Sequence, residues 1–441
     1  MRIVIAAALL LIALPAAAVA QPETIGAVPL TLDDAVRRGL ETSHRLAEAI
    51  ARGEAAGAAA DQRHAAQLPQ VAAQAGYTRT NHVQEFGVLL PNNQLRIIYP
   101  DIPDNYRTRL DVQWPLYTGG RLAAFERAAR IEAAALSNEL DAARADLRLE
   151  ITRAYWALLT ATETVRVVDE SLVRTRAHLL DARNQLEAGL AAPNDVLTAE
   201  AQESRQRMLS IQARANRDVA EAELGRLAGV QPGTPVQPVT TLDPPSAVTA
   251  DLASLVETAR QSRPERAALL KRVESATDRG KAAAAATRPT VGVGGGFDFA
   301  RPNPRIFPRH EDWAESWDAG INVNWPLFDG GRTRAEVAEA SASARAAQAR
   351  LAEFDAVLAV ELRQRVSEIE SGRAAIAAAA DAVRAATEAR RVAGERFAAG
   401  VASSTDVLDA QVAMLQAALD RTQAVANARL AEARLNRALG R

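Results

Sequence analysis

The sequence predicts an α+β membrane protein in which two tandem structural repeats each combine membrane-type strands with very long helices. Three observations support this fold class. The 441 residues are 48% apolar but only 4% aromatic, and the abundance of alanine favours long helices that pack closely. The N-terminus has the pattern of an export signal. A short motif and its surroundings occur twice, at a constant separation along the chain.

The first 20 residues have the pattern of a secretory signal peptide. Arg2 precedes an apolar run from Ile3 to Leu14, and residues 18–20 read Ala-Val-Ala. A charged start, an apolar centre and a small-residue end are typical of a cleaved signal. A membrane anchor is the alternative, but the run is shorter than the ~20 residues that a spanning helix needs. We therefore expect an exported protein with a signal peptide at residues 1–20.

The composition argues against several classes of function. The chain has no cysteine, which excludes disulfides, thiolate metal sites, thiol catalysis and a lipoprotein anchored through an N-terminal cysteine. The five histidines are scattered, without the spacing of metal ligands. Since 52 Lys and Arg balance 54 Asp and Glu, general nucleic-acid binding is not expected. We find no arrangement of catalytic groups and predict neither an enzyme nor a cofactor.

The repeat is clearest in one eight-residue motif. Trp114–Arg121 reads WPLYTGGR and Trp325–Arg332 reads WPLFDGGR, 211 residues later. Gly189 and Gly400 have the same separation, so the register holds over more than a hundred residues. Such a register predicts a tandem duplication. We expect repeat 1 over residues 21–229, a linker or equatorial segment over 230–248, and repeat 2 over 249–441.

Each repeat is expected to begin with a helix, from Thr31 to about Gln67 and from Thr249 to about Thr287. Two stretches of alternating apolar and polar residues follow each helix, and this pattern is typical of strands in outer-membrane barrels. A soluble hairpin with one buried face would show the same alternation, but the export signal and the lack of cysteine favour the barrel. The predicted strands lie near residues 69–80, 107–117, 290–300 and 317–328, with surface loops at 81–106 and 301–316.

Long helices follow the strands. The strand–helix turns contain Gly119, Gly120 and Arg121 in repeat 1 and Gly330, Gly331 and Arg332 in repeat 2. Proline-free stretches at 121–188 and 332–399 predict helices of ~100 Å, and returning helices are expected at 195–229 and 406–439. The proline-rich residues 231–245 are expected to form an irregular crossover.

Four strands from one chain cannot close a barrel, because the smallest spanning barrels have eight. Open sheet edges are not tolerated in hydrocarbon. The barrel must therefore be shared between chains, with 8, 12 or 16 strands for two, three or four copies. The helices are much longer than a membrane is thick and must project away from it.

In order and spacing, these motifs resemble the TolC-type outer membrane efflux proteins, also called outer membrane factors. The resemblance rests on the duplicated motif, the Gly189 and Gly400 helix tips, and Asp406-Val407-Leu408-Asp409. It implies a homotrimer whose shared 12-stranded β-barrel lies in outer membrane lipid and continues as a long periplasmic α-helical barrel.

The same resemblance implies a passive exit duct for drugs, toxins or proteins. An inner-membrane pump of the RND or ABC type would deliver the cargo through a periplasmic adaptor, or membrane fusion, protein. The system would be a tripartite efflux pump or a type I secretion system. A periplasmic adaptor, or a coiled-coil structural protein of the envelope that forms no pore, is the alternative.

Two carboxylates mark the expected periplasmic gate. Asp406 and Asp409 lie three residues apart and therefore share one helix face. The resemblance implies an acidic constriction here, with six carboxylates from three chains. Helix capping alone would account for Asp406 and for its counterpart Asp195, whereas the counterpart of Asp409 is Thr198.

The family also closes its entrance with polar links, and the matching positions here are Asp195, Phe397 and Ala402. The family's Tyr hydroxyl is absent at Phe397 and its Arg is absent at Ala402. We therefore expect a closed state that is held by packing and by the carboxylates, or held less firmly.

The helix tips are expected to contact the adaptor. The resemblance assigns this role to Gly189, Leu190, Gly400 and Val401, although a plain helical turn would also need glycine there. The glycine-rich residues 292–296 superficially match a phosphate loop. They precede an aromatic strand rather than a helix, so we assign them to the strand.

Overall fold

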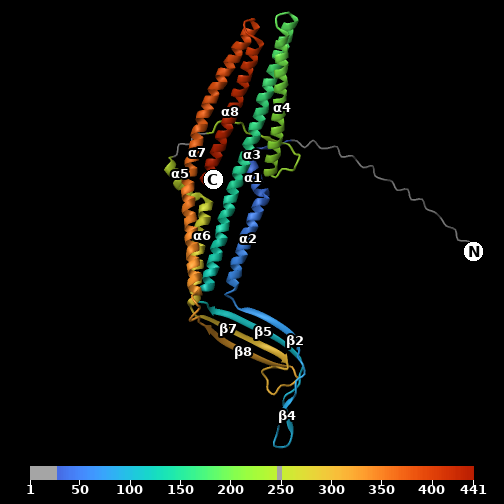
Figure 1. The fold of residues 1–441 in the computed structure, drawn as a ribbon, viewed down its shortest axis with the longest axis vertical. Helices are drawn as coiled ribbons and strands as arrows, with labels where there is room; N and C mark the ends of the chain where they lie inside the picture. Colours follow the sequence, from blue (N-terminus) through green and yellow to red (C-terminus); the bar gives the residue numbers. More distant parts are fainter. Residues whose placement is uncertain (1–26, 246–250) are drawn as a thin grey trace, which may run out of the picture.

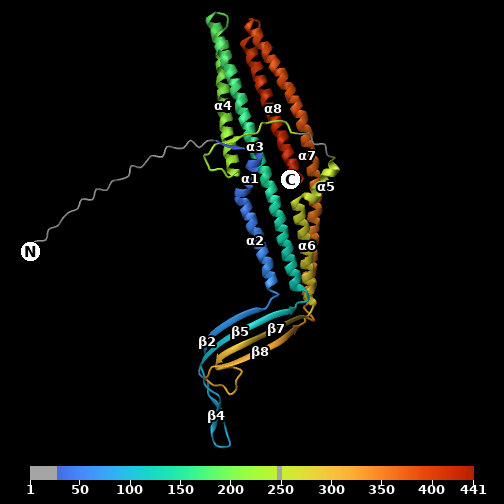
Figure 2. The same ribbon diagram turned by 180° about the vertical axis from the view of Figure 1, so that it is seen from behind.

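The computed structural model describes residues 27–245 and 251–441, so the predicted signal peptide lies outside the described residues. A curved sheet forms one end of the molecule, and helices run from it to two hairpin tips at the other end (Figure 1). The C-terminus lies about halfway along the helices, and the view from behind shows the same arrangement (Figure 2).

Four helices form the two long hairpins. Helices α3 (Arg121–Glu187) and α4 (Pro193–Leu227) form the first hairpin, and α7 (Arg332–Ala398) and α8 (Ser404–Ala438) form the second. Helices α3 and α7 each have 67 residues, and α4 and α8 each have 35. The long helices begin immediately after the Gly-Gly pairs and end at the glycine turns.

Shorter helices lie beside the lower halves of α3 and α7. They are α1 (Leu32–Thr42), α2 (His44–Ala65), α5 (Leu252–Ser262), α6 (Pro264–Ala284) and the short 3₁₀ helix η1 (Ala285–Thr287). The expectation of one continuous helix at the start of each repeat was wrong. Ser43 is extended and caps α2 with its side chain, and Pro264 begins α6 because proline has no amide hydrogen to bond to a preceding turn.

The sheet has the order β2-β5-β7-β8, and every pairing is antiparallel. Its strands are β2 (Gln70–Arg79), β5 (Asp104–Tyr117), β7 (Thr290–Arg301) and β8 (Ala314–Asn324). The register places Leu110 opposite Phe297, and Phe297 opposite Trp317. The apolar residues of the strands therefore share one face of the sheet, and this face is exposed in the single chain: Trp317 is 74% exposed and Ile321 is 70% exposed.

Three segments differ from the sequence-based expectation. Residues 81–106, expected to be a loop, contain a hairpin of β3 (Phe86–Leu89) and β4 (Leu95–Tyr99). Strand β8 stops before residues 325–328, because β7 begins at Thr290, which already pairs with Asn324. The crossover contains β6 (Val236–Pro238), which pairs in parallel with β1 (Val28–Leu30).

The β1–β6 pair in this crossover is held in place by Tyr155. Its side chain is fully buried in α3, and its hydroxyl donates to the Leu30 carbonyl oxygen at 3.1 Å and lies 2.7 Å from Thr240 Oγ1. The β1–β6 pair is thereby attached to the middle of the long helix, where the main apolar core lies. In the described part of the chain, no helix combines the length and apolar character that crossing a membrane requires.

Candidate functional site

The two hairpin tips have the same backbone geometry. Gly189 and Gly400 adopt φ of +74° and +73°, which glycine tolerates better than any other residue. The next amides reach back into the helix: Leu190 N donates to the Gln185 carbonyl oxygen at 2.8 Å and Val401 N donates to that of Arg396 at 2.9 Å. These bonds form a Schellman-type helix end. They leave Leu190 80% exposed and Val401 64% exposed.

Asp406 caps the helix that returns from the second tip. Its Oδ2 accepts from Ser403 N and from Ser403 Oγ, both at 2.8 Å, and its own amide donates to Ser403 Oγ at 3.2 Å. The bonds from Ser403 hold the pKa of the Asp406 carboxyl below its ordinary value. Asp409, one turn further along, is exposed. The capping geometry expected for Asp406 is therefore present, and the carboxylate of Asp409 faces the surroundings.

Asp195 caps α4 in a similar way, since its Oδ2 accepts from Ala192 N at 3.3 Å. Phe397 lies near the end of α7 and packs edge-on against the ring of His178, with 5.0 Å between the ring centroids. The imidazole Nε2 lies 2.8 Å from Ser404 Oγ. His178 is a residue that sequence reasoning missed, because Ser404 is 226 positions away and no spacing pattern connects them.

The strand–helix turns carry the repeated glycines. Gly119, Gly120, Gly330 and Gly331 all have positive φ, and Arg121 and Arg332 are the first helical residues. The motif's tryptophans fix the turns to the preceding helices. Trp114 Nε1 donates to the Gln67 carbonyl oxygen at 3.2 Å, and Trp325 Nε1 donates to that of Thr287 at 3.1 Å.

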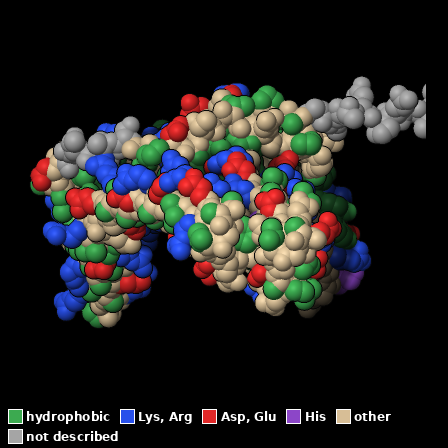
Figure 3. Space-filling model, turned by 90° about the horizontal axis from the view of Figure 1, so that it is seen from above, with side chains coloured by type: hydrophobic (Ala, Val, Ile, Leu, Met, Phe, Trp, Pro, Cys, Tyr) green, Lys and Arg blue, Asp and Glu red, His purple; other side chains and the backbone are tan. Residues whose placement is uncertain are grey.

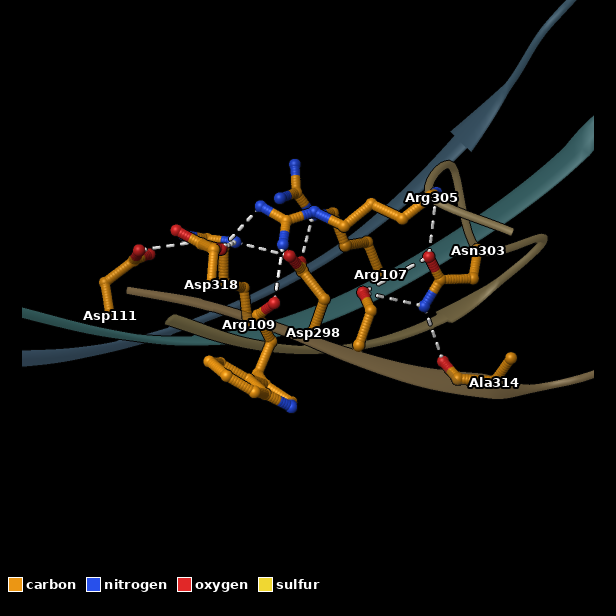
Figure 4. A network of polar contacts seen from close by, with 10 residues as sticks. Arg107, Arg109, Asp111, Asp298, Asn303, Arg305, Ala314 and Asp318 are labelled. Carbon is orange, nitrogen blue, oxygen red and sulfur yellow. Dashed lines mark hydrogen bonds and ion pairs between the residues drawn. The ribbon is translucent and has the colours of Figure 1, made fainter. Parts of the chain in front are cut away.

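A charged network covers the polar face of the sheet (Figure 4). Arg109 of β5 pairs with Asp111 at 2.7 Å, with Asp318 of β8 at 3.0 Å, and with Asp298 of β7. Arg107 donates to Asp298 at 2.6 Å, and Asp298 is only 1% exposed. The network therefore joins the three strands by charge-assisted bonds on the face opposite the apolar side chains.

The segment between β7 and β8 folds over this network. Arg305 donates to the Trp317 carbonyl oxygen at 2.8 Å and pairs with Asp318 at 2.6 Å. Asn303 is 3% exposed, and its Nδ2 donates to the Ala314 carbonyl oxygen at 2.9 Å. Side chains of this segment and of the polar sheet face line a cavity of about 330 Å³.

One glycine of residues 292–296 makes room for the network. A Cβ built at Gly296 would lie 2.4 Å from Arg109 Nη2, so a side chain there would displace the guanidinium. The glycine-rich stretch lies inside β7, as the assignment to a strand requires. The sequence showed the glycines but not the arginine on the neighbouring strand that needs the space.

Charges of both signs are interspersed on the side seen from the tips (Figure 3). Within residues 27–245 and 251–441, no group of three His, Asp or Glu side chains has a geometry that could hold a metal ion.

Comparison with known proteins places the chain in a family. The model of the outer membrane efflux protein family matches residues 35–230 and 255–441. Protein CyaE of Bordetella pertussis is 27% identical over 306 residues, which cover 69% of this chain and 64% of CyaE. The match thus spans somewhat less than two thirds of that relative.

Solved structures share the fold. The outer membrane protein VceC of Vibrio cholerae superposes with a TM-score of 0.76 at 22% identity, covering 93% of this chain and 96% of VceC. The outer membrane channel MtrE of Neisseria gonorrhoeae, solved in its open state, gives 0.75 at 19% identity, covering 93% and 88%. The matched residues include both hairpins and all four strands of the sheet, and the chain belongs to the outer membrane efflux protein family.

Proposed function

We propose that the protein is the outer membrane exit channel of a tripartite efflux or type I secretion system. The observation that carries the proposal is the sheet, which has one apolar, exposed face and one charged face. An exposed apolar face of this size needs lipid or protein against it. If the sheet closes into a barrel, the apolar face meets lipid and the charged face lines a pore.

Closure requires other copies of the chain. Strands β2 and β8 are the two edges of the sheet, and unpaired edges are not stable in hydrocarbon. In a homotrimer, β8 of one copy would pair with β2 of the next, which gives 12 strands. The two sequence repeats would then place six similar helical hairpins around the axis and form the periplasmic tunnel.

The tips are proposed to form the periplasmic entrance. Leu190 and Val401 are exposed apolar side chains beside rigid glycine turns, and such a surface suits docking of an adaptor's helices. Asp406 and Asp409 of three chains would form an acidic ring with Asp195 and Phe397 close by. Cargo would pass without a catalytic step, delivered by an inner-membrane RND or ABC-type pump, after export of this chain by its N-terminal signal.

The alternative of an adaptor or a coiled-coil envelope protein that forms no pore is less well supported. Neither of these functions would require a sheet whose apolar face is exposed along four strands. The family match also supports the channel.

Planar-bilayer recording of the purified full-length protein tests the channel and its acidic ring. The wild type should conduct and prefer cations, because carboxylates at a constriction attract them. The double substitution D406N/D409N should lower the cation preference while keeping the capping geometry. D381N removes an exposed carboxylate on α7, about 17 residues from the tip of that helix, and should leave selectivity unchanged.

The outcomes separate the two parts of the proposal. A wild type that never conducts would overturn the channel. A conducting channel whose D406N/D409N variant keeps the wild-type selectivity would overturn only the acidic ring.

A further inference from the structure

A buried histidine joins the two hairpins near their tips. His178 of α3 is 5% exposed, and its Nε2 lies 2.8 Å from the hydroxyl of Ser404, the first residue of α8, which is 1% exposed. The ring also packs edge-on against Phe397 near the end of α7, with an angle of 61° between the ring planes. One imidazole on the first hairpin thus contacts both helices of the second.

The surroundings of His178 support the same interface. One turn away, Thr175 Oγ1 lies 3.2 Å from Gln411 Oε1 of α8, and both side chains are buried or nearly so. Apolar side chains of α3, α4 and α8 pack beside this pair, including Leu179 and Leu408. Separation of the hairpins at this level would break both polar contacts and expose the imidazole.

The interface favours an uncharged imidazole. Ser404 lies at the N-terminus of α8, where the helix dipole is positive and disfavours a cation. The charged groups that act on His178 are Asp181 of α3 and Asp195 of α4, while α7 presents Phe397 and α8 presents Ser404. Burial lowers the pKa of His178 below its ordinary value, and the two carboxylates and a hydrogen bond with Ser404 oppose this shift only in part.

We propose that the contact of His178 with Ser404 and Phe397 holds the hairpin tips closed, and that protonation of His178 releases it. The inference rests on the proposed entrance at the tips and adds its regulation. It also supplies a polar link at an interface where Phe397 and Ala402 lack the groups that the family uses.

The direction of the pH effect follows from linkage. When the hairpins separate, His178 meets water and its pKa returns toward its ordinary value of about 6.5. A histidine whose pKa is lower in the closed state stabilises that state fully above this pH. The stabilisation is lost as the pH falls further, so the entrance opens more readily in acid.

The link is confined to one of two related contacts. The positions 211 residues from His178 and Ser404 are Ala389 and Pro193, which cannot form it. The contact therefore joins the hairpins of one chain. The related contact between α7 and the next chain's α4 in the proposed trimer lacks this pair.

Single-channel recording between pH 7.5 and pH 5.5 tests the proposal. The wild-type open probability should rise several-fold as the pH falls. H178Q keeps an amide nitrogen near the position of Nε2 but does not titrate, so it should stay as closed as the wild type at pH 7.5 and lose the rise. S404A removes the hydroxyl without changing the helix cap at Ser403 and should open more often at pH 7.5. The control H64Q, at a half-exposed histidine of α2, should behave like the wild type.

A cross-link provides a measurement that does not depend on pH. The chain has no cysteine, so T175C/Q411C introduces the only pair. Oxidation should hold the channel closed at both pH values, reduction should restore the wild-type response, and T175C alone should have no effect.

The results distinguish this proposal from the channel itself. If the wild type conducts but H178Q shows the same pH response as the wild type, or if the oxidised T175C/Q411C channel opens normally, the contact of His178 is not the gate. The proposed channel function would be unaffected by either result. A wild type without conductance would instead overturn the proposed function.

Discussion

Helices α3 and α7 have the same length and are bounded by the same kinds of glycine turn, yet they have different surroundings. Both have 67 residues, begin after a Gly-Gly pair and end at a glycine turn. In α3, 20 residues are buried, but in α7 only four are. The reason is position, because α3 packs against α2, α4, α6 and α8, whereas α7 lies at the edge of the chain and packs mainly against α6 and α8 (Figure 1).

The sequence repeat therefore fixes the length of these two helices, whereas the elements packed around each helix fix how much of it is buried. Val357 and Val360 of α7 are 54% and 68% exposed, although they lie on a helix as apolar as its counterpart. In the proposed trimer, this face of α7 would be covered by the next chain. Matched substitutions in the two halves can test that view.

The largest difference is expected at Tyr155 and its counterpart Val366. Tyr155 is fully buried and its hydroxyl holds the β1–β6 pair, so Y155A loses a packed ring and one of the two donors to the Leu30 carbonyl oxygen, the other being Val239 N. We expect a loss of about 4 kcal/mol of stability. V366A removes two methyl groups from a partly buried site and should cost about 1 kcal/mol. Thermal unfolding of the detergent-solubilised variants measures the difference, and equal shifts would contradict it.

Arg437 and Arg226 form a second matched pair, also 211 residues apart. The Arg437 side chain is 9% exposed and joins α8 to Asp146 of α3 at 2.8 Å and to Glu265. Glu265 is only 25% exposed and would keep just Arg263 as a partner, so R437A should cost about 2 kcal/mol. Arg226 is 62% exposed beside Glu223, and R226A should cost less than about 1 kcal/mol. Similar unfolding midpoints for both variants would show that the contacts of Arg437 add nothing to the stability of the fold.

The same pair predicts a dependence on pH. Burial raises the pKa of Glu265, but the bond from Arg437, a backbone hydrogen bond and the charges of Arg263 and Arg437 together outweigh it and hold the pKa below the ordinary value. A carboxyl with a lowered pKa stabilises the fold above about pH 4.3, and this stabilisation is lost as the pH falls through the folded-state pKa. The stability gap between wild type and R437A should therefore narrow as the pH falls below about 4.3. In E265Q, which does not titrate, the gap between this variant and E265Q/R437A should stay nearly constant.

A smaller difference is expected at the strand–helix turns. Gly119 and Gly330 both have φ of +65°, so alanine is strained at either position by ~1–2 kcal/mol. A Cβ at Gly119 would also lie 2.7 Å from Arg288 Cβ, whereas at Gly330 nothing lies within 4 Å. G119A should therefore be the less stable by about 1–2 kcal/mol. A lower melting temperature for G330A than for G119A would refute the assignment of the contact.

The smallest effect on the folding of the single chain is expected at the exposed face of α7. V360K places a charge on a side chain that the chain leaves 68% exposed, so the chain's own helix content should change little. If the next copy covers this face, light scattering should show fewer trimers, with E370K, a charge change at an exposed, already charged position on another side of the same helix, as the control. Unchanged trimers in V360K would show that this face is not an interface.

The sequence predicted the helices well where its signals are local. The Gly-Gly-Arg turns, Pro69 and the glycine tips mark element ends because backbone conformation depends on the residue at that position. It did not predict the breaks at Ser43 and Arg263, because a short cap inside a helical pattern is a weak signal. Nor did it predict the β3–β4 hairpin or the β1–β6 pair, since Pro- and Asn-rich composition is equally compatible with a loop.

The residues of the candidate site likewise fall into those that the sequence could predict and those that it could not. Asp406, Gly189 and Gly400 could be singled out from motif and spacing, and their local geometry depends on neighbours within a few residues. His178, Arg109 and Asp298 could not, because their partners lie 226, 209 and 191 positions away.

The sequence alone determined the length of the helices, their glycine boundaries and the alternation of the strands, because each depends on conformational preferences within a few residues. The tertiary structure decided which faces are covered and which charges meet. It placed α3 inside the bundle and α7 at its edge, and it brought a histidine to the start of a distant helix. Those contacts depend on how rigid elements pack, and two segments of equal length and matching boundaries can therefore have different surroundings.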